Sequence, residues 1–174
     1  MGSSTRAFED LAVPLGRWLA SMGVHLLNGG GAAAMEAVSR AFVSVTPREG
    51  LVIGVLPADL PDGAPVPRAG YPNPFVEIAI FTHLPLNGIT GTDPRSRNHI
   101  NILSSDVVVV LPGGEGTQSE MELAVRYGKP IIAFFGEHSV EWQVPAGVSV
   151  ARALAEVDRF LRTTLEGRLR QESQ

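Results

Sequence analysis

Two spacings of apolar residues alternate along the chain. In some segments apolar side chains recur every three or four positions, as at Leu11, Leu15 and Leu19, which is typical of a helix with one buried face. Other segments are short apolar runs. The run from Asp106 to Leu111 holds four consecutive valines, which predicts a strand buried on both faces. The predicted helices span residues 5–22, 32–42, 93–104, 116–127 and 149–168, and the predicted strands span residues 24–27, 51–56, 75–81, 106–111 and 130–135.

The predicted strands and helices alternate, which indicates the fold class. Alternation of this kind favours an α/β, Rossmann-like, doubly wound parallel sheet with helices on both faces. The 174 residues suit one such domain, which we expect to span residues 1–174. The proline-rich stretch 57–74 and residues 82–92 are expected to be loops. Asp93 is expected to cap the following helix, with Pro94 at its first position.

The composition of the chain argues against nucleic-acid and membrane partners. The chain is 44% hydrophobic and 18% charged with a net charge of −4, and it has no basic cluster, so we expect a globular protein that does not bind nucleic acid. No apolar run approaches the roughly 18 residues that would span a bilayer, so no membrane partner is expected. The chain has no cysteine, which fits a cytoplasmic protein. Trp18 and Trp142 are expected in the core or at an interface.

Two glycine clusters each follow a predicted strand and precede a predicted helix. The first is Gly29, Gly30 and Gly31, and the second is Gly113, Gly114 and Gly116. Ligands bind at the carboxyl ends of parallel strands, and a helix N-terminus attracts an anion such as phosphate. Thr117 adds a hydroxyl donor. The alternative to ligand binding is that both clusters are only tight turns between strand and helix. Neither matches the G-x-G-x-x-G fingerprint or a P-loop.

Arg97 and Glu120 are the candidate chemical groups. Glu120 lies one turn into the helix after the second glycine cluster, where its side chain can point back toward a ligand. Arg97 and the neighbouring Asn98 lie on the preceding helix. Arg and a carboxylate beside a phosphate site suit sugar-phosphate chemistry. The alternative is a structural ion pair that ties two helices together. His83 and His99 are not spaced as metal ligands, and no metal site is expected.

The run Pro112–Glu120 resembles the PGGxGTxxE motif of the LOG-like ("lonely guy") family, once labelled lysine decarboxylases. Arg97 lies at the spacing of that family's catalytic Arg. The stretches 28–35 and 53–57 are similar to two further family segments, and Gly2–Ser4 resembles the loop after the family's first strand. The resemblance covers about residues 1–136. It implies a phosphoribohydrolase that cleaves nucleoside 5′-monophosphates without a metal.

Another part of the chain is more similar to the molybdenum cofactor carrier proteins, a sister group with the same fold. The run from Arg97 to Asp106 and the loop from Asn73 to Thr92 carry this similarity. It implies a binding protein for a phosphorylated pterin. Relatives with this fold pair through helices, so a homo-oligomer is expected. The family begins with a central strand that is apparently absent from this chain, which we interpret as a truncated or misassigned start.

The sequence therefore predicts a protein that binds a phosphorylated, nucleotide-like small molecule, with a molybdenum cofactor carrier as the first hypothesis. The alternative is a nucleoside 5′-monophosphate phosphoribohydrolase, and a weaker third is a nucleotide sensor. No resident cofactor is required, and the expected ligand is a molybdopterin-type molecule or a nucleotide. The candidate catalytic residues are Arg97 and Glu120, and the candidate binding residues are Ser3, Ser4, Gly29, Gly30, Gly31, Asn98, Gly113, Gly114, Gly116 and Thr117.

Overall fold

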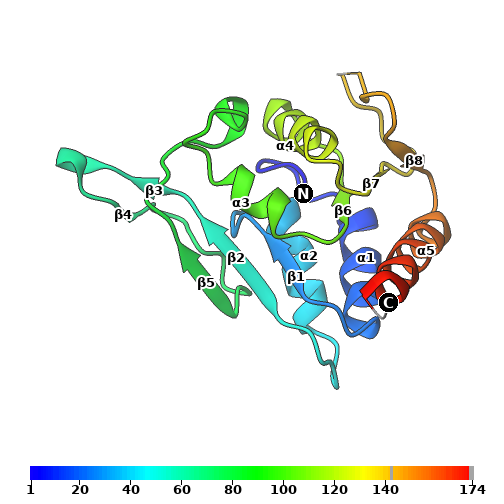
Figure 1. Ribbon diagram of the computed structural model, residues 1–174. Helices are drawn as coiled ribbons and strands as arrows, with labels where there is room; N and C mark the ends of the chain where they lie inside the picture. The colour runs from blue at the N-terminus through cyan, green and yellow to red at the C-terminus, as the bar shows by residue number, and fades with distance from the viewer. Residues whose placement is uncertain (142, 173–174) are drawn as a thin grey trace.

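The computed structural model describes residues 1–141 and 143–172, and of residues 168–172 it describes only the backbone. Trp142 lies outside the described residues. The architecture is α/β, with parallel strands flanked by helices (Figure 1), which confirms the predicted fold class. The helices are α1 (Glu9–Ser21), α2 (Ala34–Val43), α3 (Asn98–Leu103), α4 (Glu115–Arg126) and α5 (Leu154–Glu172), with 3₁₀ turns η1 (Pro61–Gly63) and η2 (Gly88–Thr90).

The parallel strands of the described residues fall into two sheets of three strands each. In one the order is β1-β2-β5, and in the other it is β6-β7-β8. A short antiparallel pair, β3-β4, lies within the predicted loop 57–74. The strands are β1 (Leu26–Asn28), β2 (Val52–Leu56), β3 (Ala58–Asp59), β4 (Val66–Pro67), β5 (Ile78–Phe81), β6 (Val108–Val110), β7 (Ile131–Phe134) and β8 (Ser149–Ala151).

Alternating side chains of β7 divide the core into two layers. Ile132 and Phe134 pack with residues of α1, α2 and α5, whereas Ile131 and Ala133 pack with residues of α3 and α4. This alternation follows from the two-residue period of a strand. α1 and α2 approach closely at Gly16, where a side chain would meet the Val38 carbonyl oxygen.

The first residues of the chain run beside β6. The Met1 amine donates to the Val109 carbonyl at 2.8 Å, and the Leu111 N–H donates to the Met1 carbonyl at 2.8 Å. Met1 is therefore bracketed by the two residues on either side of Val110, which is the hydrogen-bond pattern of parallel strands. The chain's first residues lie at the centre of the molecule, between the two sheets (Figure 1).

Several predicted element boundaries are wrong: α1 begins at Glu9 and β5 at Ile78, and the starts of α3 and α5 differ for local reasons. Asp93 does not cap a helix, because its carboxylate accepts the Arg95 N–H at 2.9 Å and closes a local turn, so α3 begins only at Asn98. Residues 149–151, predicted as the start of the last helix, instead form β8 beside β7. The last helix begins after them because the Glu156 carboxylate accepts the backbone N–H groups of Arg152 and Ala153.

Candidate functional site

Both glycine clusters lie at the carboxyl ends of strands, as predicted. Residues 29–31 connect β1 to α2, and residues 113–114 connect β6 to α4. Ser3 lies between the two loops: its N–H donates to the Pro112 carbonyl at 3.1 Å, and its carbonyl accepts the Ala34 N–H at 3.1 Å. The backbone of Ser3 therefore holds the two loops together.

In the first loop, glycine is required for two different reasons. Gly30 has a φ of +68°, which favours glycine, and its N–H donates to the Asn28 side-chain oxygen at 2.8 Å. Asn28 is itself held by Ser39. At Gly29 the Arg97 guanidinium occupies the space that a side chain would need. The first cluster is therefore more than a tight turn, because it admits a buried arginine.

The second loop leaves the N-terminus of α4 open. Gly114 is the N-cap residue and makes no side-chain cap, and α4 begins at Glu115. The first N–H groups of a helix have no partner within the helix. At Gly113 the Thr117 hydroxyl fills the side-chain position, but nothing lies within 4 Å of the corresponding point at Gly114. The Thr117 N–H donates to the Gly114 carbonyl at 2.9 Å, and the N–H groups ahead of it, beside this open space, suit an anion.

Arg97 and Glu120 come together in the structure. Arg97 Nη1 lies 3.9 Å from Glu120 Oε1, and the two side chains are only 4% and 11% exposed. That distance is too long for a hydrogen bond. Arg97 Nε and Nη1 have no hydrogen-bond partner among the described residues. A buried guanidinium with unpaired donors is costly, so this arrangement is suited to a ligand that supplies acceptors.

Burial shifts the protonation of this pair. It lowers the pKa of Arg97, against the opposing effect of Glu120, and it raises the pKa of the Glu120 carboxyl, against the opposing effect of Arg97. The Met1 amine is a third charge nearby, and burial lowers its pKa. Glu120 therefore keeps its proton to a higher pH than an exposed carboxyl, as a general acid requires.

The structure also locates the remaining predicted binding residues. The Ser3 hydroxyl accepts the N–H groups of Thr5 and Arg6 and so closes its own turn, while Ser4 is exposed. Asn98 is buried against Gly91, and its side-chain oxygen has no partner among the described residues.

The first turn of α4 is partly covered. Gly116 packs against Gly88 of η2, and the Ser119 hydroxyl donates to the Gly88 carbonyl at 2.9 Å. Thr117 is buried. The predicted loop 82–92 therefore lies against one side of the candidate anion site.

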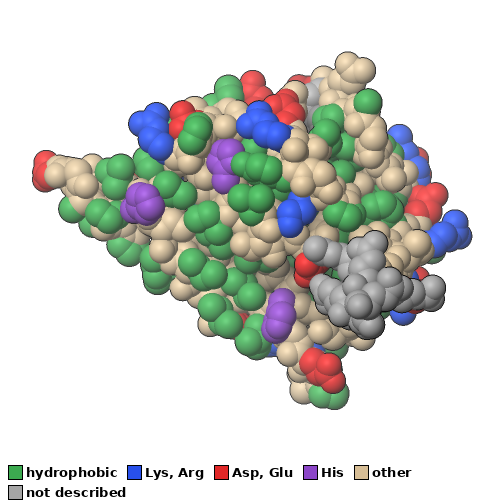
Figure 2. Space-filling model, in the orientation of Figure 1, with side chains coloured by type: hydrophobic (Ala, Val, Ile, Leu, Met, Phe, Trp, Pro, Cys, Tyr) green, Lys and Arg blue, Asp and Glu red, His purple; other side chains and the backbone are tan. Residues whose placement is uncertain are grey.

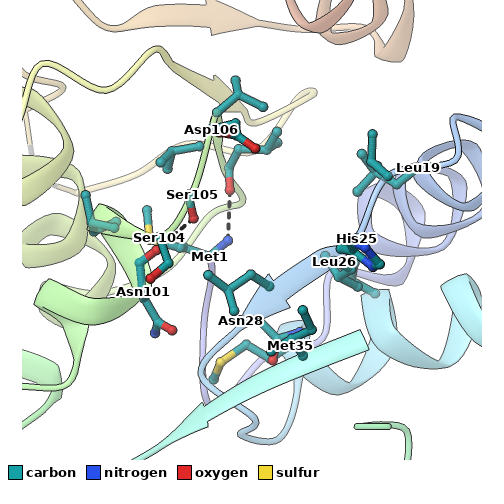
Figure 3. A pocket seen from close by; sticks show the side chains of 18 of the residues that line it. Met1, Leu19, His25, Leu26, Asn28, Met35, Asn101, Ser104, Ser105 and Asp106 are labelled. Carbon is teal, nitrogen blue, oxygen red and sulfur yellow. Dashed lines mark hydrogen bonds between the residues drawn. The ribbon is translucent and has the colours of Figure 1, made fainter. Parts of the chain in front are cut away.

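Two residues of the site, Tyr71 and Asn73, are not predicted from the sequence. Tyr71 lies beside the Arg97 guanidinium and over Gly31. Asn73 holds the first loop, since its side chain donates to the Gly31 carbonyl at 2.8 Å. Asn101, four residues after Arg97 on the same helix, also has a buried side-chain oxygen without a partner among the described residues, and it lies in the lining of the cavity that holds Met1 (Figure 3). Tyr71 and Asn73 come from the proline-rich segment, where no helical or strand period indicates which residues face inward.

His99, one of the two histidines considered as metal ligands, is held by hydrogen bonds within the protein. His99 lies within hydrogen-bond distance of the Tyr127 hydroxyl, at 2.6 Å, and of the Asp93 carbonyl, at 3.0 Å. Within residues 1–141 and 143–172 there is no group of three His, Asp or Glu residues that could hold a metal ion. In the same part of the chain, no helix has the length and apolar character needed to cross a bilayer.

Comparison with known proteins extends this picture. The chain is similar to the X-ray structure of the protein TM1055, with 25% identity and a TM-score of 0.68 over 89% of this chain and 87% of that one. It is similar to the molybdenum cofactor binding protein of Rippkaea orientalis, with 28% identity, and to the molybdenum cofactor carrier protein of Chlamydomonas reinhardtii, with 27% identity. In both cases the TM-score is 0.65, over 91% of this chain and 88% of the other.

Comparison with known sequences assigns this chain to a family. An uncharacterized protein of Archaeoglobus fulgidus is 31% identical over 121 residues, which are 70% of this chain and 66% of that protein. The sequence pattern of the SLOG cluster4 family matches residues 1–158. This protein is therefore a member of the SLOG cluster4 family.

Proposed function

We propose that this protein binds a phosphorylated, nucleotide-like small molecule between its two glycine loops, as a carrier of the molybdenum-cofactor type. The observation that carries the proposal is the buried Arg97 guanidinium, which has two donor nitrogens without partners among the described residues and lies against Gly29. Two of the similar solved structures are proteins that bind or carry the molybdenum cofactor, which supports this ligand class.

The residues present fit a phosphorylated ligand. The free N–H groups at the start of α4 and the open space over Gly114 would hold the phosphate. Arg97 would supply charge-assisted hydrogen bonds to it. The unpaired side-chain oxygen of Asn98 would accept from the polar edge of the ligand. The pterin and its metal are cargo in this proposal and take no part in chemistry on the protein.

Equilibrium binding tests the proposal. We expect molybdopterin to bind, and Arg97→Gln to weaken binding at least tenfold because the neutral amide loses the charged donors. Arg95→Ala is the matched control, because Arg95 is 71% exposed and pairs with Asp93 at the surface. If Arg97→Gln folds normally and binds as tightly as the control, the phosphate does not contact Arg97 and the proposal is wrong.

The buried pair of Arg97 and Glu120 favours hydrolysis as a second candidate function. Arg97 and Glu120 lie 3.9 Å apart in a buried site, and burial raises the pKa of the carboxyl. A protonated Glu120 would donate its proton to the base of a nucleoside 5′-monophosphate as the bond between base and sugar breaks, and a water molecule would add at the sugar carbon, which makes a phosphoribohydrolase the alternative. Incubation with AMP, GMP and CMP should then release free base, and Glu120→Gln should abolish the release. Absence of base, together with tight molybdopterin binding, excludes the hydrolase.

We further propose that the protein is a cytoplasmic homo-oligomer. Hydrophobic side chains gather over the part of the surface where β2 and β5 lie (Figure 2), and Ile78, Ile80 and Phe81 of β5 are 42%, 43% and 60% exposed. Apolar patches of this kind mark interfaces. Light scattering that gives the mass of one chain at micromolar concentration would contradict the oligomer.

A further inference from the structure

The proline-rich segment 57–74 carries Tyr71 over the first glycine loop. Asn73 fixes the segment there, because its N–H donates to the Gly30 carbonyl at 2.7 Å and its side chain donates to the Gly31 carbonyl at 2.8 Å. The Tyr71 hydroxyl oxygen and the ring atom Cε1 lie 3.2 and 3.3 Å from the point where a side chain at Gly31 would begin. The glycine at that position therefore makes room for the half-buried Tyr71 side chain.

The same loop receives the Arg97 guanidinium, which fills the space over Gly29. Burial lowers the pKa of Arg97, and the charge of Glu120 and a hydrogen bond with the Tyr71 side chain are among the contacts that oppose this effect. Arg97 Nε and Nη1 have no hydrogen-bond partner among the described residues. The contact with Tyr71 therefore leaves these two donors free.

Glu120 approaches the same guanidinium from the second loop. It lies in the first half of α4, and its Oε1 is 3.9 Å from Arg97 Nη1. Guanidinium and carboxylate groups that are free to approach form two parallel hydrogen bonds, and such a closed pair would use the donors that a phosphate needs. A phenol hydroxyl is a neutral acceptor, so it can hold a guanidinium without neutralising its charge. A hydrogen bond with Tyr71 is therefore compatible with a free Arg97 charge, whereas a closed pair with Glu120 is not.

We propose that Tyr71 is a positioning residue of the candidate site: its hydroxyl holds the Arg97 guanidinium apart from Glu120, so that Nε and Nη1 stay available to a phosphate. The hydroxyl acts on the ligand only through Arg97. This inference rests on the proposed function for the ligand, but the arrangement of the three side chains can be tested without one.

The first test uses the ligand-free protein. Tyr71→Phe keeps the ring over Gly31 and removes only the hydroxyl, so Arg97 should close on Glu120. The described groups that act electrostatically on Glu120 are Arg97 and the Met1 amine. A closer guanidinium favours the ionised carboxyl, so the pKa of Glu120 should fall. Its titration midpoint, followed by carboxyl ¹³C NMR, should move down by at least about half a pH unit.

The matched control is Tyr127→Phe. Tyr127 is the only other tyrosine in the chain, and its hydroxyl lies 2.6 Å from His99 Nδ1 on α3. The exchange removes the same atom beside the helix that follows Arg97, so it reports any general loosening of α3. It should leave the titration of Glu120 unchanged.

The second test measures the equilibrium binding of molybdopterin. Tyr71→Phe should weaken binding at least about fivefold, because a hydrogen bond that orients Arg97 is lost. In a Glu120→Gln background the guanidinium has no carboxylate to close on, so the same exchange should weaken binding less than about twofold. Tyr127→Phe should bind as tightly as the native chain.

Two outcomes overturn the proposal. A titration of Glu120 that is unchanged in Tyr71→Phe would mean that the hydroxyl does not hold Arg97 away from the carboxyl, whatever ligand binds. Equal losses of affinity in the native and Glu120→Gln backgrounds would mean that Tyr71 contacts the ligand itself. A native chain that binds no molybdopterin, but in which Tyr71→Phe lowers the pKa of Glu120, supports the arrangement of the three side chains and contradicts only the proposed function.

Discussion

At the scale of single residues, the glycines of the two loops are present for different reasons. Gly30 has a positive φ, Gly29 makes room for Arg97, and Gly113 makes room for the Thr117 hydroxyl. Gly114 has a negative φ of −101° and open space at its side-chain position. The fold therefore gives no reason for glycine at Gly114, whereas a ligand that approaches the backbone there does.

This difference predicts opposite effects of one substitution on stability and on binding. In Gly114→Asp the new carboxylate can cap α4, because Asp is among the preferred N-cap residues, so stability should rise by a few tenths of a kcal/mol. The same carboxylate repels a phosphate at the helix N-terminus, so affinity for molybdopterin or AMP should fall at least tenfold. Thermal unfolding and equilibrium titration measure the two effects.

The matched control is Gly167→Asp. Gly167 lies in α5, far along the chain, and also has open space at its side-chain position. It should leave ligand affinity unchanged. If Gly114→Asp binds the ligand as tightly as this control, the phosphate site is not at the start of α4.

At the scale of elements, the contact between α1 and α2 depends on a single small residue. A side chain at Gly16 would begin 2.5 Å from the Val38 carbonyl oxygen and 2.8 Å from the Ala41 side chain, both on α2. Backbone at that distance cannot rotate away, so the two helices would have to separate. The contact of these helices is part of the core beside β7.

We therefore expect Gly16→Ala to destabilise the protein by about 1–3 kcal/mol, although alanine favours helix formation. Gly167→Ala is the comparison, because it makes the same exchange in a helix where nothing lies within 4 Å; it should be neutral or stabilising by up to about 1 kcal/mol. Urea unfolding gives both values. Equal stabilities of the two variants would show that α1 and α2 can separate without cost.

Elements with a strong local period could be predicted from the sequence, and those set by distant partners could not. β6 and α4 were predicted because a valine run and a glycine-led helix carry their own signals. β8 forms because it pairs with β7, which no local pattern reveals. In the candidate site, motif and spacing singled out Arg97 and Glu120, whose side chains lie 3.9 Å apart in the structure. Tyr71 lies beside Arg97, but it belongs to a proline-rich segment. That segment has no helical or strand spacing of apolar residues from which its course could be predicted.

At the scale of the whole molecule, three buried ionisable groups come from distant parts of the chain. Glu120 from α4 lies within electrostatic reach of both Arg97, at the start of α3, and the Met1 amine. Burial raises the pKa of the Glu120 carboxyl above its usual 4.5. The folded protein therefore holds this proton more tightly than the unfolded chain does, which links global stability to pH.

The sign of this linkage gives a measurable prediction. The stabilising effect of protonated Glu120 is fully present below pH 4.5 and is lost as the pH rises through the raised pKa. In Glu120→Gln this loss is absent. The stability of the variant relative to the native chain should therefore increase with pH above 4.5, by up to about 1.4 kcal/mol per pH unit.

Urea unfolding at a series of pH values between 4 and 7 measures this slope. The matched control is Glu122→Gln, which changes an exposed carboxylate on the same helix. The removal of Arg97's partner can lower the stability of Glu120→Gln at every pH, but it does not alter the slope that Glu120 itself contributes. A difference from the native chain that stays constant across this range would show that folding does not raise the pKa of Glu120, and the acid role in the hydrolase alternative would then be lost.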